Sequence, residues 1–237
     1  MSGIARIMLA KGFSISGSDK NDSPMLTSLK ALGAKIEIGH DAKNLGDADL
    51  VIISSAIGEK NPELMAAKAK GLPIAARAIA LAWLMSDSTS VAVAGTHGKT
   101  TTTALITAMT TAGGLQPSSI IGADVLGSNG NVHGDGSLLI IEADESDGTL
   151  DVLPLSCVVV TNIDIDHLDY FGSFEAIKEC FADATTRTYG AVVLNADDVG
   201  SSELLNALGR DPRVTTFGWS ERSTVRITSA EPHSEGT

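Results

Sequence analysis

The strongest chemical signal in the 237-residue sequence is the segment VAVAGTHGKTTT, residues 91–102. A β-branched strand runs into glycines and then into a helix, so backbone N–H groups and the helix N-terminus converge where an anionic phosphate is favoured. Lys99 adds a positive charge for the β- and γ-phosphates, and Thr100 adds a hydroxyl for Mg²⁺. The loop, Gly95-x-x-Gly98-Lys99-Thr100, is shorter than the usual phosphate-binding pattern. The alternative is an ordinary strand-to-helix turn that holds a lysine.

A second signal is LLIIEADESD, residues 138–147, where an apolar strand delivers Glu142 at its carboxyl end. Ligands bind at that edge of open α/β sheets, and a carboxylate there can hold Mg²⁺ against nucleotide phosphates. The alternative is that Glu142, Asp144, Glu145 and Asp147 merely solvate a loop.

A third strand, in VVVTNIDIDHLDYF, residues 158–171, ends in the polar side chains of Asn162, Asp164, Asp166, His167 and Asp169. Among carboxylates, His167 could be a metal ligand, a base or a hydrogen-bonded surface histidine. Because parallel strands deliver their ends to one side of a sheet, we expect Thr100, Glu142 and His167 to lie at one edge.

The elements that must position these residues alternate between short Val- and Ile-rich runs and longer helical patterns, which predicts an α/β fold with mostly parallel sheets. The small, polar segment MSDSTS, residues 85–90, predicts a boundary between two domains, residues 1–88 and 89–237. We expect strands at 13–18, 35–38, 50–54, 73–76, 90–94, 138–143, 157–161, 191–195 and 214–218, and helices at 3–10, 25–32, 62–70, 78–85, 99–112, 174–188 and 201–208. The tail at 220–237 has little pattern.

Composition excludes several classes of protein. The net charge is −12, and no Lys/Arg-rich run is present, which argues against nucleic acid or an anionic membrane as partner. No apolar run approaches the roughly 18 to 20 residues needed to span a bilayer. The two cysteines, Cys157 and Cys180, show no metal-binding or disulfide pattern, which favours a reducing cytoplasm.

At these motifs the chain resembles the Mur ligase family. GTHGKTTT, EADESD and TNIDIDHLDYF stand in the order and spacing of that family's nucleotide domain. The first half is similar too, in MSGIARIMLAKGFSISGSD, LGAKIEIGHD and ADLVIISSAIGEKNPELMAAKAKGLPI. Ser55, where the D-glutamate-adding relatives tend to have proline, favours the alanine-adding branch.

The resemblance implies a Rossmann-like first domain, a P-loop second domain, and ATP-dependent joining of L-alanine to the carboxylate of UDP-N-acetylmuramate with Mg²⁺. Lys99 would bind the γ-phosphate, Thr100 and Glu142 would hold Mg²⁺, and His167 would hold a metal near the reacting carboxylate. The nucleotide-binding residues would be Gly95, Thr96, His97, Gly98, Lys99, Thr100, Thr101 and Asn162. We expect Lys99 to be exposed, so that its replacement by alanine abolishes turnover with little loss of stability.

In the first domain, an acidic residue after a strand, Asp19, can accept the ribose hydroxyls of a nucleotide. The resemblance implies that Ser18, Asp19, His40, Ser54 and Ser55 surround the UDP group. Ser54 and Ser55 could equally cap the next turn, and His40 could be an ordinary surface residue.

The chain departs from the family pattern at both ends. The family's opening strand and GxGGxG turn, the end of its nucleotide domain and its third domain are not in these 237 residues. We therefore expect both domains to be incomplete, the helix at 3–10 to be loose or packed on an incomplete sheet, and the chain alone to bind ATP or UDP-sugar weakly and to fail to ligate. The alternatives are a catalytically inactive nucleotide-binding fragment and a peptide-recycling ligase that acts on the same sugar nucleotide.

Overall fold

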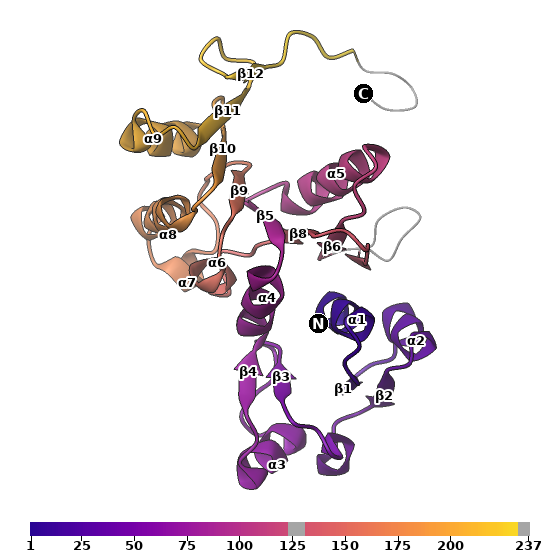
Figure 1. Ribbon diagram of the computed structural model, residues 1–237. Helices are drawn as coiled ribbons and strands as arrows, with labels where there is room; N and C mark the ends of the chain where they lie inside the picture. The colour runs from indigo at the N-terminus through magenta and orange to yellow at the C-terminus, as the bar shows by residue number, and fades with distance from the viewer. Residues whose placement is uncertain (123–130, 232–237) are drawn as a thin grey trace. The chain divides into compact units, whose positions relative to one another are not determined.

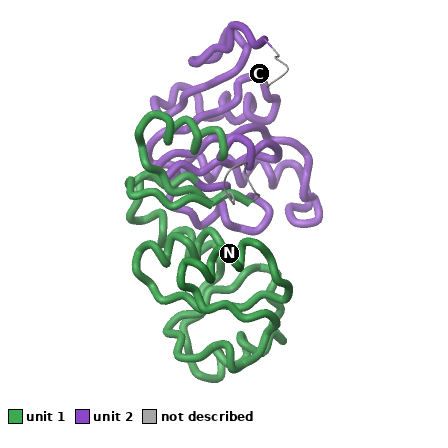
Figure 2. Tube along the Cα trace, turned by 90° about the vertical axis from the view of Figure 1, so that its right-hand side faces the viewer, with its two compact units in different colours: residues 1–89, 104–140 green, residues 90–103, 141–237 purple. Residues whose placement is uncertain are grey.

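The computed structural model describes residues 1–122 and 131–231, which fold into two compact units (Figure 2). Unit 1 comprises residues 1–89 and 104–140, and unit 2 comprises residues 90–103 and 141–237. Both units are α/β with mostly parallel strand pairs, as the sequence predicts. The division into domains at residue 88 stays a prediction, and the last part of the unpatterned tail, 232–237, lies outside the described residues.

Unit 1 holds two separate two-stranded parallel sheets, β1 with β2 and β3 with β4 (Figure 1). This agrees with the expected incomplete sheet, since among the described strands β1 pairs with β2 alone and β3 with β4 alone. Its elements are α1 Ser2–Ala10, β1 Ser16–Asp19, α2 Pro24–Ala31, β2 Lys35–Ile38, the 3-10 helix η1 Ala42–Leu45, β3 Val51–Ile53, α3 Pro62–Lys70, β4 Ile74–Ala76, α4 Arg77–Ser86, β6 Ser118–Ile120 and β7 Asn131–Val132.

The sequence did not predict β6 and β7, which pair antiparallel and follow β8 (Leu138–Glu142) in the strand order. Helix α1 packs against this pair and against α2, and its Ile4 and Ile7 are buried. The helix at the start of the chain is therefore well packed, on a strand pair that the sequence pattern did not show.

Local sequence signals determine where α3 begins and ends. The Asn61 side chain accepts hydrogen bonds from the N–H groups of Glu63 and Leu64, at 2.9 and 3.1 Å, directly before Pro62. At the other end Gly71 adopts φ +68°, a conformation that other residues rarely take. The N-cap, the first-turn proline and the C-cap of this helix are thus all residue types that mark helix ends in a sequence.

Unit 2 is built on parallel strands in the order β12-β11-β10-β9-β5, with the end of β8 beyond β5. The sequence pattern did not show α6, α7 and β12. The elements, of which β5, α5 and β8 are shared with unit 1, are β5 Thr89–Ala94, α5 Lys99–Ala112, β8 Leu138–Glu142, α6 Thr149–Val152, β9 Cys157–Val160, α7 Leu168–Phe171, α8 Phe174–Arg187, β10 Ala191–Asn195, α9 Val199–Leu208, β11 Val214–Gly218 and β12 Val225–Arg226.

The core of unit 2 is mostly aliphatic, in keeping with the 4% of aromatic residues in the sequence. Val158 and Val160 of β9 and Leu194 of β10 are fully buried, and Phe181 of α8 joins them as a fully buried aromatic ring. Strands buried on both faces read as continuous apolar runs, which is why the sequence located them well. In residues 1–122 and 131–231, no helix combines the length and the apolar character that crossing a bilayer requires.

Candidate functional site

The candidate site of unit 2 begins with the loop between β5 and α5, residues 95–98. Gly95 has φ +127° and Gly98 has φ +81°, both in the region that favours glycine. At Gly95 a Cβ atom would also lie 2.9 Å from the carbonyl oxygen of Asn162, whereas around Gly98 the space is open. The loop therefore needs glycine at Gly95 for its backbone angle and for a close approach, and at Gly98 for its backbone angle alone.

The residues after β9 hold this loop in place. Asn162 accepts a hydrogen bond from the His97 N–H at 2.9 Å and donates one to the His97 carbonyl at 2.8 Å. The Thr161 hydroxyl also donates to that carbonyl, at 2.6 Å, and the Thr96 N–H donates to the Asn162 carbonyl at 3.1 Å. The structure thus places the predicted site residue Asn162 against the loop, where it is bonded to the backbone.

The other predicted loop residues differ in their surroundings. The Thr96 hydroxyl is buried and accepts from the Asp164 N–H at 2.9 Å, which adds a further tie to the segment after β9. His97 and Thr101 are exposed. Side-chain bonds hold Thr96, whereas His97 and Thr101 face solvent.

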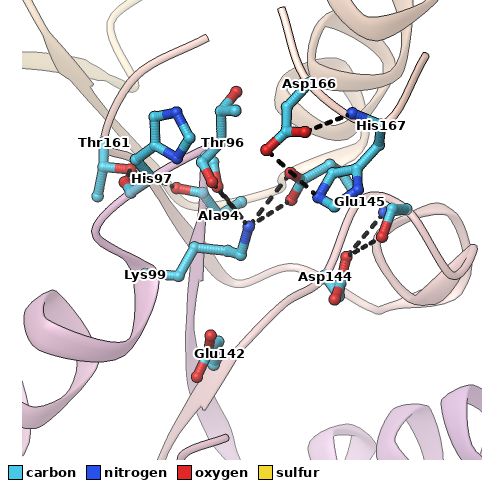
Figure 3. A network of polar contacts seen from close by, with 12 residues as sticks. Ala94, Thr96, His97, Lys99, Glu142, Asp144, Glu145, Thr161, Asp166 and His167 are labelled. Carbon is cyan, nitrogen blue, oxygen red and sulfur yellow. Dashed lines mark hydrogen bonds and ion pairs between the residues drawn. The ribbon is translucent and has the colours of Figure 1, made fainter. Parts of the chain in front are cut away.

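Lys99 is not exposed, so this sequence-based prediction is wrong. Its side chain is 11% exposed, and its Nζ lies 3.0 and 3.2 Å from the two carboxylate oxygens of Glu145 (Figure 3). The same Nζ donates to the carbonyl oxygens of Gly95 at 2.7 Å and Thr96 at 3.3 Å. The Lys99 ammonium therefore bonds to its own loop and to the buried carboxylate of Glu145 instead of facing solvent.

Glu145 is the site residue that sequence reasoning did not single out, since it stands among acids that can equally solvate a loop. Its side chain is only 2% exposed. Burial raises the pKa of Glu145, and the Lys99 ammonium opposes that shift. An ionised carboxylate at this depth needs a cationic partner, which Lys99 supplies.

Thr100 and Glu142 meet directly at the start of α5. The Thr100 hydroxyl donates to Glu142 Oε1 at 2.9 Å. Both are hard oxygen donors of the kind that Mg²⁺ takes while it keeps several waters or phosphate oxygens, so the pair fits the ion. Among the described residues, no group of three or more His, Cys, Asp and Glu side chains is arranged to hold a metal.

The remaining acids of the loop after β8 are held locally. Burial acts to raise the pKa of Asp144, but hydrogen bonds from the N–H and hydroxyl of Ser146, with Lys99 and His167 nearby, lower it overall. Asp147 accepts from the Thr149 N–H at 2.9 Å. These bonds show that the acidic loop is a folded structure rather than a solvated one.

His167 lies at the same edge, because the parallel strands β5 and β9 both end there. Its neighbours differ from those of Glu142. Among the described residues other than glycine, His167 alone has a positive φ, +49°. Its N–H donates to Asp166 Oδ1 at 2.7 Å, and its Nε2 lies 3.8 Å from Asp166 Oδ2 (Figure 3). Left-handed backbone outside glycine is uncommon and often marks functional positions, which keeps His167 a candidate.

In unit 1 the structure brings Ser18 and His40 together around a residue that the sequence did not indicate, Glu63. Ser18 Oγ lies 2.9 Å from His40 Nδ1 and donates to Glu63 Oε1 at 2.7 Å. The same oxygen accepts from the Asp41 N–H at 3.2 Å and from Asn44 Nδ2 at 3.0 Å. Glu63 lies in the first turn of α3, where an acid is expected to stabilise the helix start. That position gives no sign of the contacts with Ser18, Asp41 and Asn44.

The other residues predicted for this domain make local bonds. Asp19 accepts from the Asn21 N–H at 3.1 Å, and Ser54 accepts from the Ala56 N–H at 3.1 Å. Ser55 is exposed. Ser54 therefore makes a turn-capping bond, and its place at the UDP group stays a prediction.

Comparison with known proteins identifies relatives for nearly the whole chain. Residues 1–89 match the "Mur ligase family, catalytic domain", and residues 93–237 match the "Mur ligase middle domain". A UDP-N-acetylmuramate–L-alanine ligase of Clavibacter michiganensis subsp. michiganensis is 43% identical over 96% of this chain and 48% of its own length. The enzyme of the same description from Parvibaculum lavamentivorans is 44% identical over 97% of this chain and 47% of its own length. The chain spans about half the length of the curated relatives it matches.

Two solved structures of ligases named for UDP-N-acetylmuramate are also similar to this chain. A UDP-N-acetylmuramate:L-alanyl-γ-D-glutamyl-meso-diaminopimelate ligase from Neisseria meningitides aligns with a TM-score of 0.83 at 26% identity, covering 100% of this chain and 78% of its own. A UDP-N-acetylmuramate–alanine ligase from Thermotoga maritima aligns with a TM-score of 0.78 at 29% identity, covering 94% of this chain and 51% of its own.

Proposed function

Because this chain belongs to the Mur ligase family, we propose that the protein carrying it is an ATP-dependent ligase that joins L-alanine to the carboxylate of UDP-N-acetylmuramate in peptidoglycan precursor synthesis. The observation that carries the proposal is the identity of 43 and 44% to two relatives described as alanine ligases, over almost the whole chain. The contacts among Lys99, Thr100, Glu142 and Glu145 support it, since they gather a cation and two hard-oxygen donors at one loop.

In the proposed reaction, the muramoyl carboxylate attacks the γ-phosphorus of ATP, and ADP leaves with the electrons of the broken P–O bond. The amine of L-alanine then attacks the acyl phosphate, loses a proton and displaces inorganic phosphate. Lys99 and the N-terminus of α5 offset the charge of the phosphates. Thr100 and Glu142 would hold Mg²⁺, which when bound neutralises phosphate charge, and His167 would hold a metal near the reacting carboxylate.

The two predicted domains divide the substrates between them in this proposal. Residues 89–237 bind ATP, with the loop residues Gly95 to Thr101 and Asn162 around the nucleotide. Residues 1–88 bind the UDP group, and the contact of Ser18 with His40 supports a shared role for these two residues. Asp19, Ser54 and Ser55 complete that proposed site. A reducing cytoplasm belongs to the proposal, since both cysteines are free thiols.

A second function has one specific observation in its favour. The neighbour from Neisseria meningitides, which joins a tripeptide to UDP-N-acetylmuramate according to its description, aligns over the entire chain with a TM-score of 0.83. Its identity of 26% is well below that of the alanine ligases. We therefore rank ligation of a peptide to the same sugar nucleotide second.

Phosphate release from ATP tests the proposal in the protein that carries this chain, with UDP-N-acetylmuramate and either L-alanine or L-alanyl-γ-D-glutamyl-meso-diaminopimelate. We expect release with L-alanine, loss of release in Lys99→Ala, and unchanged release in the matched surface variant Lys178→Ala. Release with the tripeptide alone would transfer the assignment to a peptide ligase. Nucleotide binding without release in either mixture would identify a binding protein that lacks catalysis.

A further inference from the structure

The Lys99 ammonium has every proton engaged by its own unit. An ammonium carries three N–H donors and no acceptor. Four oxygen atoms lie within hydrogen-bond distance of Nζ, two from the loop carbonyls of Gly95 and Thr96 and two from the Glu145 carboxylate. A phosphate oxygen can bind this ammonium only by replacing one of these acceptors.

Glu145 is the acceptor whose loss changes the charge balance most. The two carbonyls belong to the loop that Asn162 and Thr161 hold, so they move with the binding site. Glu145 lies 46 residues away in the chain and carries a full negative charge when it is ionised. A phosphate brought to Nζ therefore has to take over hydrogen bonds that this carboxylate now accepts, and hydrogen bonds between charged groups are the stronger ones.

We propose that Glu145 is a positioning residue that competes with nucleotide phosphate for the Lys99 ammonium and so sets how tightly the loop binds ATP. The inference rests on the proposed nucleotide site. The neighbouring acids do not compete for Lys99 in this way, because Glu142 bonds to Thr100 and Asp144 bonds to Ser146. Lys99 must give up its contact with Glu145 to reach the phosphate. The free energy of ATP binding is therefore less favourable by the strength of that contact.

Glu145→Gln tests the proposal, since the amide keeps the shape and one acceptor oxygen but removes the charge. We expect the protein that carries this chain to bind ATP with Mg²⁺ about tenfold more tightly in the variant, the difference between a charged and a neutral hydrogen bond, as measured by isothermal titration calorimetry. Glu203→Gln is the matched control, because Glu203 pairs with Lys178 at 3.1 Å on the surface of the same unit and loses the same charge. Its affinity should equal that of the wild type.

A double-mutant cycle shows whether Glu145 acts through Lys99. In a Lys99→Met background, Glu145→Gln should leave the affinity unchanged. A gain that persists in this background would overturn the proposal, because Glu145 would then repel phosphate directly.

Glu145→Asp separates charge from shape and serves if the glutamine variant does not fold. Aspartate keeps the charge at a shorter reach, so we expect an affinity between those of wild type and Glu145→Gln. A weaker affinity than wild type in Glu145→Asp, or an unchanged affinity in Glu145→Gln, would overturn the inference while leaving the nucleotide site standing. Absence of ATP binding in the wild type and in Glu203→Gln alike would overturn the nucleotide site and the inference with it.

Discussion

Replacing Lys99 with alanine should destabilise the protein substantially, in contrast to what an exposed loop lysine would do. The change removes the partner of Glu145, whose side chain is 2% exposed, and leaves a buried carboxylate without its cation. Removing one member of a buried ion pair typically costs about 3–5 kcal/mol, because the remaining charge stays desolvated. We expect a loss of this size in the free energy of unfolding, measured by urea denaturation at pH 8.

The loss should depend on pH in a defined direction. Burial already raises the pKa of Glu145 while Lys99 is present to oppose the shift. Without Lys99, folding holds this pKa further above its value in the unfolded chain. Below the pKa that Glu145 has in the unfolded chain, the carboxyl group is neutral in both states and contributes its full stability. As the pH rises through the pKa of the folded state, the free energy of unfolding falls, because the unfolded chain releases this proton more readily. Lys99→Ala should therefore lose less stability at pH 5 than at pH 8.

Two variants control this experiment. Lys178→Ala removes the lysine of a surface pair whose acid, Glu203, is 55% exposed, and it should have a much smaller effect. Lys99→Met combined with Glu145→Gln removes both charges and should recover most of the stability that Lys99→Ala loses. Equal losses in Lys99→Ala and Lys178→Ala, with no pH dependence, would refute the reasoning from the buried pair.

Three further outcomes are expected. Gly95→Ala should lower the free energy of unfolding by roughly 2–4 kcal/mol, from backbone strain and a steric clash, while Gly98→Ala, which adds strain alone, should lower it by about 1–2 kcal/mol; equal values in urea denaturation would contradict the close approach. Glu142→Ala should raise the Mg²⁺ concentration needed for half-maximal phosphate release, and an unchanged titration would leave Glu142 as a partner of the helix start only. Burial raises the pKa of Cys157 and, together with a nearby acid, that of Cys180 to about 12, so both thiols should react with iodoacetamide at pH 8 far more slowly than a free cysteine; rapid labelling followed by mass spectrometry would disprove this.

The sequence predicted best the features that are written in consecutive residues. The strands at Leu138–Glu142 and Cys157–Val160 are short apolar runs buried on both faces, and their boundaries were nearly correct. The caps of α3 follow from Asn61, Pro62 and Gly71, each of which acts on its own neighbours. Local chemistry of this kind needs no knowledge of the fold.

What the sequence did not predict depends on contacts between distant residues or on very short elements. The pairing of Lys99 with Glu145 joins residues 46 positions apart, so no local pattern distinguishes a buried lysine from an exposed one. The same holds for Glu63, which meets Ser18 from 45 positions away. Helices α6 and α7 have four residues each, too few for a helical period to show.

The ties that Thr161 and Asn162 make to the phosphate loop have a consequence for the kinetics and entropy of binding. Three hydrogen bonds fix His97 and one fixes Thr96, all of them internal to unit 2. The loop is therefore ordered when the protein folds, and a ligand that binds it loses little affinity to further ordering. Two of the loop's N–H groups are committed to Asn162, which leaves the recognition of a phosphate to groups nearer the start of α5. Loosening the end of β9 should thus slow association and weaken binding, even through residues that never touch the ligand.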